Sequence, residues 1–89
     1  MSGSDYTISL TRSARLALAE KLPFDVAAGA VEFFAGALSS DPHRVGKALD
    51  GIHSARLMRE WRILCVIDDD SHLVTVRGIF HRRDAYRSH

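Results

Sequence analysis

The second half of the chain carries three runs of strand-forming residues. WRILCVID, residues 61–68, is almost continuously apolar, which is typical of a central strand covered on both faces. LVTVRGIFH, residues 73–81, follows a short acidic turn and is rich in β-branched residues. SARLM, residues 54–58, precedes this pair and ends in a turn near Arg59 and Glu60. The three runs predict an antiparallel meander.

The first half of the chain predicts one strand and two helices. YTISL, residues 6–10, alternates like a short strand, and Thr11 after it is a candidate helix N-cap. A helical stripe then follows up to Pro23, formed by Ala14, Leu16, Leu18, Ala19 and Leu22. The segment from Pro23 to Pro42 predicts a second helix, which ends at Ser-Ser-Asp-Pro. The predicted class is α+β in the order β-α-α-β-β-β, with the N-terminal strand and a helical hairpin packed on an antiparallel sheet.

Size and composition indicate one small soluble domain spanning residues 1–89, with residues 1–5 as a frayed start. The chain has 89 residues, of which 46% are hydrophobic and 26% charged, as in ordinary globular domains. The longest apolar run, residues 63–67, is far shorter than the roughly 20 residues of a transmembrane helix. The start lacks the basic and apolar regions of a secretory signal. A cytoplasmic protein without membrane segments is therefore expected, and the single Cys65 is expected to be a buried core residue.

The basic residues are unevenly distributed, although the formal net charge is only +1. Residues 1–51 contain five basic and six acidic side chains, whereas residues 52–89 contain seven basic and five acidic ones. Ten of the twelve basic residues are arginines, whose planar guanidinium groups suit phosphate oxygens and base edges. The C-terminal half therefore favours an anionic partner.

The order of these segments resembles the RelE toxins of the RelE/ParE superfamily. The matching pieces are the helical hairpin ending in DPHRVGKAL, the strand opening WRILCVID, the acidic turn, the strand LVTVRGIF and the ending HRRDAYR. The resemblance implies the fold predicted above and a ribosome-dependent mRNA endonuclease. It also implies a cognate antitoxin that neutralises the toxin in a hetero-oligomer. Members of the family are usually strongly basic, whereas this chain is nearly neutral.

The resemblance also implies the site residues. Arg62 matches the arginine after the strand aromatic, and Arg82 matches the arginine just past the last strand; both would stabilise phosphate charge. Arg56 falls where the family carries a basic residue at the scissile phosphate, and Tyr86 matches the C-terminal tyrosine. Further RNA contacts are expected from basic residues around this set: Lys47, Arg59, Arg83 and Arg87.

The residue chemistry is compatible with RNA cleavage by the substrate's own 2′-hydroxyl group. That reaction needs a base, an acid and groups that stabilise the five-coordinate phosphate. His81 is a candidate acid or base because an imidazole titrates near neutral pH. No metal or other cofactor is expected, since the chain has no CxxC and no helical i, i+4 pair among its histidines, which are His43, His53, His72, His81 and His89.

The strand register determines which arginines converge. If the turn pairs Ile67 with Leu73, Arg62 lies opposite Gly78, which leaves room for a guanidinium group. Arg62 then shares a face with two residues of the last run, Phe80 and Arg82. A shift of one residue would move Arg62 to the other face.

Two other functions remain open from the sequence. A ParE-like toxin would share this scaffold and inhibit DNA gyrase, although the HRRDAYR ending favours the nuclease. A catalytically silent binding module acting with its antitoxin would fit the low net charge. The candidate residues also have structural interpretations: the arginines could be ordinary strand-edge and terminal charges, His81 could have a structural role, and Tyr86 could only dock the chain end onto the sheet.

Overall fold

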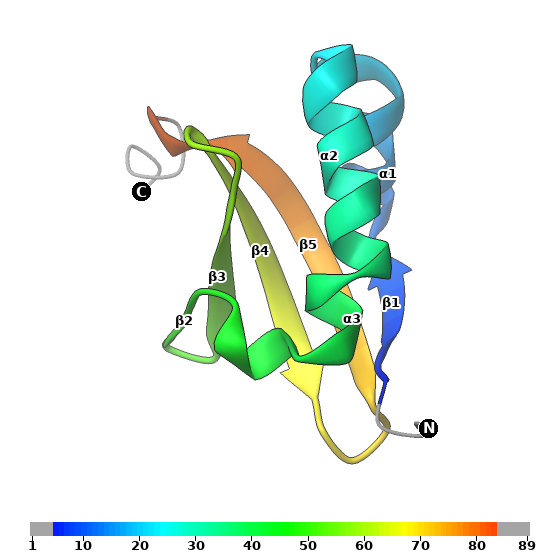
Figure 1. Cartoon of the computed structure of the whole chain (residues 1–89), viewed down its shortest axis with the longest axis vertical. Helices are drawn as coiled ribbons and strands as arrows, with labels where there is room; N and C mark the ends of the chain where they lie inside the picture. Colours follow the sequence, from blue (N-terminus) through cyan, green and yellow to red (C-terminus); the bar gives the residue numbers. More distant parts are fainter. Residues whose placement is uncertain (1–4, 84–89) are drawn as a thin grey trace.

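The computed structural model describes residues 5–83 as a five-stranded sheet with helices packed on one of its faces (Figure 1). The elements are β1 Thr7–Leu10, α1 Arg12–Leu16, the π-helical turn η1 Ala17–Lys21, α2 Phe24–Ala35, α3 Ala37–Ser40, the 3₁₀ turn η2 Pro42–Arg44, β2 Lys47–Leu49, β3 Ile52–Leu57, β4 Trp61–Asp68 and β5 Leu73–His81. The strand order is β1-β5-β4-β3-β2. Strand β1 is parallel to β5 and the other neighbours are antiparallel. The predicted α+β fold and its meander are confirmed.

The two predicted helices form, but each is interrupted. The Thr11 hydroxyl oxygen accepts a hydrogen bond from the Ala14 N–H at 3.2 Å, which confirms Thr11 as the N-cap of α1. The Leu22 N–H then bonds the carbonyl of Ala17, five residues earlier, at 2.9 Å. The wide turn ends the regular α-helix. Of the residues in the predicted stripe, Leu16 is 38% exposed and Ala19 is exposed as well, so the stripe is only partly buried. The second predicted helix is divided at Gly36, between α2 and α3.

The core lies between α1, α2, α3 and one face of the sheet. Helix α2 contributes Val26, Ala30 and Phe34, all buried. Buried sheet residues opposite the helices alternate along the strands, as period-two geometry requires: Ala55, Leu57, Ile63, Cys65, Val74 and Val76. Ile79 faces the same core but follows Val76 by three positions, because the bulge adds one residue to β5. The other face of β4 is only half-buried, so the expectation that this strand is covered on both faces is wrong. No helix within residues 5–83 is long and apolar enough to cross a membrane.

A short hairpin that the sequence analysis did not predict forms the edge of the sheet. Strand β2 pairs with β3 around a two-residue turn, Asp50-Gly51, with φ of 53° and 85°. Positive φ at both positions is characteristic of a type I′ turn, for which Asp-Gly is a favoured pair. The signal was therefore present in the sequence. Before β2, Gly46 has a φ of 88°, and a Cβ built there would lie 2.0 Å from the Ser54 carbonyl oxygen.

The two glycines of this edge predict different costs of substitution. A Cβ at Gly51 meets nothing within 4 Å, so Gly51→Ala should cost only the strain of positive φ, about 1–2 kcal/mol. Gly46→Ala adds a backbone clash and should lower the free energy of unfolding clearly more. Urea denaturation of both variants measures the difference. Equal costs would contradict the close approach of Gly46 to β3.

The end of the sheet opposite the β3–β4 turn is held together by a polar cluster. The Tyr6 hydroxyl donates to Asp69 Oδ1 at 2.5 Å, and His43 Nε2 lies 2.7 Å from the same oxygen. The Tyr6 ring also stacks on His72 at 4.6 Å between centroids. These contacts join the start of β1, the η2 turn and the β4–β5 turn. The hydrogen bonds from Tyr6 and His43 lower the pKa of Asp69, and the carboxylate raises the pKa of Tyr6.

This cluster should make stability depend on pH. Because the pKa of Asp69 is lowered in the folded state, its stabilising contribution is complete above the pKa of an unfolded aspartate, about 3.9. The contribution is lost as the pH falls through the lower, folded-state value. Asp69→Asn should therefore reduce Tm at neutral pH and have much less effect in acid. Asp70→Asn, which changes a neighbouring exposed carboxylate, is the control, and equal pH profiles for the two variants would contradict the role of Asp69.

Candidate functional site

The strand register places two arginines and one aromatic ring in a single row across the sheet. Arg56 of β3 pairs with Arg62 of β4, and Arg62 pairs with Phe80 of β5. Directly paired residues project to the same face, and this face lies opposite the helices. We call Arg56, Arg62 and Phe80 the cross-sheet row.

The partner of Arg62 differs from the predicted one. Ile67 pairs with Val74, one position later than expected, and a bulge between Leu64 and Cys65 adds a second shift. Together the two shifts move the partner of Arg62 from Gly78 to Phe80. Because side chains alternate with a period of two, a shift of two residues preserves the face. Arg62 and Phe80 therefore share a face as predicted, although the assumed register was wrong.

Gly78 makes room for an aromatic ring. A Cβ built at Gly78 would lie 2.6 Å from Cε2 and Cζ of Phe80, so the ring lies against the glycine backbone. The space that was predicted for the Arg62 guanidinium group is occupied by Phe80. Phe80 is still 37% exposed, which leaves an aromatic surface beside Arg62.

The row brings like charges together. Arg56 and Arg62 stand directly opposite each other on neighbouring strands. Lys47 of β2 pairs with Ser54, two residues before Arg56, so it projects to the same face at the sheet edge. The planar guanidinium groups suit phosphate oxygens, so this face could bind an anion through more than one cation.

The end of β5 adds a second group of polar residues beside the row. The Arg82 N–H donates to the Glu60 carbonyl oxygen at 2.6 Å, which extends the β4–β5 ladder by one pair. Arg82 and Arg83 line a hollow together with Glu60 and His81. His81 Nε2 lies 3.3 Å from Glu60 Oε1. The sequence analysis did not select Glu60, because an acid in a turn carries no signal of its own.

The structure unites only part of the predicted set. Arg56 and Arg62 are paired, Lys47 lies on their face, and Arg82 and Arg83 follow the strand that ends the row. Arg59 lines a different hollow, between the β3–β4 turn and the start of α2. The predicted Tyr86 and Arg87 lie outside the described residues.

The described residues favour neither a reactive cysteine nor a metal site. Cys65 is fully buried, and desolvation raises its pKa to about 11, so the thiol is protonated at neutral pH and confirms the core prediction. Within residues 5–83, no group of three or more His, Cys, Asp or Glu side chains is placed to hold a metal ion.

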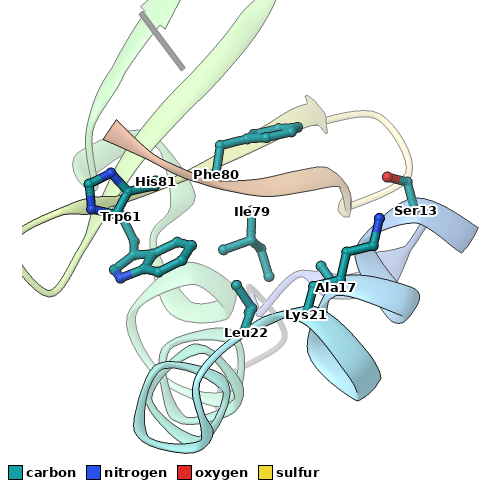
Figure 2. A pocket seen from close by; sticks show the side chains of 8 residues that line it. All are labelled: Ser13, Ala17, Lys21, Leu22, Trp61, Ile79, Phe80 and His81. Atoms are coloured by element: carbon teal, nitrogen blue, oxygen red, sulfur yellow. The ribbon is translucent and has the colours of Figure 1, made fainter. Parts of the chain in front are cut away.

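A groove of about 290 Å³ runs beside the far end of β5 (Figure 2). Strand β1 pairs with β5 only as far as Val76, whereas β5 continues to His81. Figure 2 shows Ile79 and Phe80 projecting to opposite sides of β5, with Ile79 on the side of the groove. Trp61 and Lys21 also line it. The groove is thus a slot lined by apolar side chains such as Trp61 and by polar ones such as His81, with the exposed Lys21 at its rim. It lies next to a strand edge that β1 does not cover.

The curated proteins that are similar to this chain are toxins. No family model matches the chain. The chain is 40% identical to toxin RelE of Mycobacterium tuberculosis over 86 residues, covering 92% of this chain and 87% of that toxin. It is 43% identical to toxin RelG of the same organism over 86 residues, covering 92% of this chain and 97% of that toxin.

The solved structures agree with these relatives. The toxin–antitoxin complex RelBE2 of Mycobacterium tuberculosis matches with a TM-score of 0.80 at 41% identity, covering 88% of this chain and 99% of the matched one. A mutant of the Escherichia coli toxin RelE in the free state matches with a TM-score of 0.73 at 13% identity, covering 92% of this chain and 88% of that one. The second match shows the shared fold alone.

The contact between Phe80 and Gly78 predicts a strong coupling between the two positions. Gly78→Val should lower the free energy of unfolding, because the new side chain displaces the Phe80 ring. In a Phe80→Ala background the cost of the same change should be smaller by at least about 1 kcal/mol. Urea unfolding of the four proteins of this double-mutant cycle measures the coupling. The control is Thr75→Val, also on β5, whose change in the free energy of unfolding should add to that of Phe80→Ala. If the changes for Gly78→Val and Phe80→Ala were also additive, the packing of the Phe80 ring on Gly78 would be contradicted.

Proposed function

The chain belongs to the RelE family of toxins, and from this premise we propose that it is the toxin of a type II toxin–antitoxin system that cleaves mRNA on the ribosome. The cleavage inhibits translation and arrests growth. The whole chain, residues 1–89, acts as one toxin domain in the cytoplasm. We do not propose gyrase inhibition, because the toxins and the complex that the chain matches are of the RelE type.

The observation that carries the proposal is the direct pairing of Arg56 with Arg62. The pair places two guanidinium groups on one face of the sheet, on neighbouring strands. An RNA phosphate bound by both groups would accept charge-assisted hydrogen bonds from them. The same bonds strengthen as the phosphate gains negative charge in the transition state, which is the condition for catalysis.

Cleavage proceeds through the 2′-hydroxyl group of the RNA without a metal ion. The 2′-hydroxyl loses its proton to a base as its oxygen attacks the adjacent phosphorus, and the 5′-oxygen of the next nucleotide leaves and takes up a proton from an acid. The products are a cyclic phosphate and a free 5′-hydroxyl end. Arg62 and Arg56 stabilise the five-coordinate phosphate, and Arg82 adds a third cation from the end of β5. Tyr86 stacks on a base or transfers a proton.

The aromatic surface next to the arginines supports binding of unpaired RNA. Phe80 is partly exposed beside Arg62, and exposed aromatic rings stack on splayed bases at about 1–3 kcal/mol per base. We therefore assign Phe80 as a stacking platform for a base next to the scissile phosphate. The other cations guide the RNA backbone to this point: Lys47, Arg59, Arg83 and Arg87.

An antitoxin of the RelB type neutralises the toxin by binding it in a hetero-oligomer. The matched Mycobacterium tuberculosis structure is a complex of this kind. The groove along β5 suits an extended antitoxin segment, because a strand can add to the edge that β1 leaves uncovered while an apolar side chain enters the slot beside Trp61. An acidic segment would also pair with Lys21 at the rim.

Primer extension on ribosome-bound mRNA tests the function. The wild-type protein should produce discrete cuts, and Arg62→Ala combined with Arg82→Ala should reduce the cleavage rate at least about a hundredfold, since both cations stabilise the transition state. Arg12→Ala combined with Arg15→Ala is the matched control, because it removes the same charge from exposed positions of α1. The control should cut like the wild type.

The products test the mechanism independently of the rate. Attack by the 2′-hydroxyl leaves a 5′-hydroxyl end, and a single 2′-deoxy substitution at the cut site should abolish cleavage there. Products with a 5′-phosphate would exclude the proposed reaction and point to attack by water. Addition of the purified antitoxin should suppress all cuts.

A further inference from the structure

His81 is held at both ring nitrogens by its own chain. The Arg83 N–H donates to His81 Nδ1 at 3.2 Å, so Nδ1 must present its lone pair. The proton of the neutral ring is therefore on Nε2, which faces Glu60 Oε1 at 3.3 Å. One imidazole thus bridges the β3–β4 turn and the residues that follow β5.

The sheet also directs His81 away from the cross-sheet row. His81 pairs with Trp61, one position out of phase with the pair of Arg62 and Phe80, and alternate residues project to opposite faces. The His81 and Trp61 rings meet edge to face at 5.2 Å between centroids. The side chain is only 30% exposed. The imidazole is therefore packed beside Trp61, on the face opposite Arg56 and Arg62.

Glu60 contacts residues 81–82 through both its backbone and its side chain. Its backbone carbonyl accepts from the Arg82 N–H at 2.6 Å, and its carboxylate faces the His81 ring. Arg82 therefore lies between two residues that are also held, because His81 contacts Glu60 and the Arg83 N–H donates to the His81 ring. The groups with charge around His81 are Glu60, Arg82 and Arg83 in one hollow and Lys21 across the groove.

We propose that Glu60 and His81 form a clip that positions Arg82 at the phosphate site, and that His81 is a positioning residue and does not transfer a proton. This inference rests on the proposed nuclease function. An acid or base must present a nitrogen to the substrate, and both His81 nitrogens are engaged by Glu60 and Arg83. A displacement of Arg82 by about 1 Å is enough to reduce cleavage roughly a hundredfold.

Paired amide substitutions separate positioning from proton transfer. In His81→Asn the side-chain oxygen can occupy the place of Nδ1 and accept from Arg83, so cleavage should stay within about threefold of the wild type. In His81→Gln the amide occupies the place of Nε2 and the Arg83 contact is lost, so cleavage should fall about tenfold or more. Glu60→Gln should keep cleavage and Glu60→Ala should lose it, with Glu32→Ala as the exposed control.

The rates are measured in single turnover on ribosome-bound mRNA from about pH 5.5 to 8.5, the range in which an imidazole titrates. The shape of the pH profile should be the same for wild type, His81→Asn and His81→Gln. A loss of about a hundredfold in both variants, with one limb of the profile removed, would show that His81 transfers a proton and would overturn the proposal. Wild-type rates in both variants would also overturn it, since positioning would then be unnecessary.

A spectroscopic measurement on the full-length wild-type protein does not depend on cleavage. Long-range ¹H–¹⁵N correlation of the histidine rings, recorded at about pH 8.5 where an ordinary imidazole is neutral, should show His81 protonated on Nε2 and unprotonated on Nδ1. A proton on Nδ1 would refute the clip even if the protein cleaves RNA. If the expected tautomer is found but the wild type makes no cuts, the clip stands and the nuclease function fails.

Discussion

The register of β4 between β3 and β5 is the constraint on which the candidate site depends. Arg62 pairs with Arg56 of β3 on one side. On the other side it pairs with Phe80 only because the β4–β5 ladder contains a bulge between Leu64 and Cys65. Core residues on the opposite face fix that register, since a slip of one position would expose Ile63 to water. Packing on the helical side therefore determines which cations meet on the other side.

Local clustering explains how a nearly neutral chain can present an electropositive site. The formal net charge is +1, yet the sheet places Arg56 directly against Arg62 and keeps Lys47 on the same face. At close range a phosphate responds to the neighbouring charges more strongly than to distant ones, which salt screens. The acidic residues of the β4–β5 turn lie at the other end of β4, where Asp69 holds Tyr6 and His43.

The two ends of the sheet thus have different chemical roles. At one end, Asp69 joins β1, η2 and the β4–β5 turn, which keeps the paired strands in place. At the other, Glu60 and His81 hold the residues that follow β5. Hydrogen bonds between groups far apart in sequence supply order where the short strands alone could fray. The cations of the candidate site thus lie on strands whose ends are anchored by hydrogen bonds.

The sequence by itself determined the predicted strands and helices and the meander, because apolar periodicity and turn residues are local signals. The face shared by Arg62 and Phe80 was predicted from a register that is wrong, and it agrees because the two shifts add to two residues. It also contained the Asp50-Gly51 turn signal, which was overlooked. Only the tertiary structure decided the two register shifts, the packing of Phe80 on Gly78 and the contact of His81 with Glu60. Each of these depends on which distant residues fit together in space, and side-chain alternation along a strand carries no record of that choice.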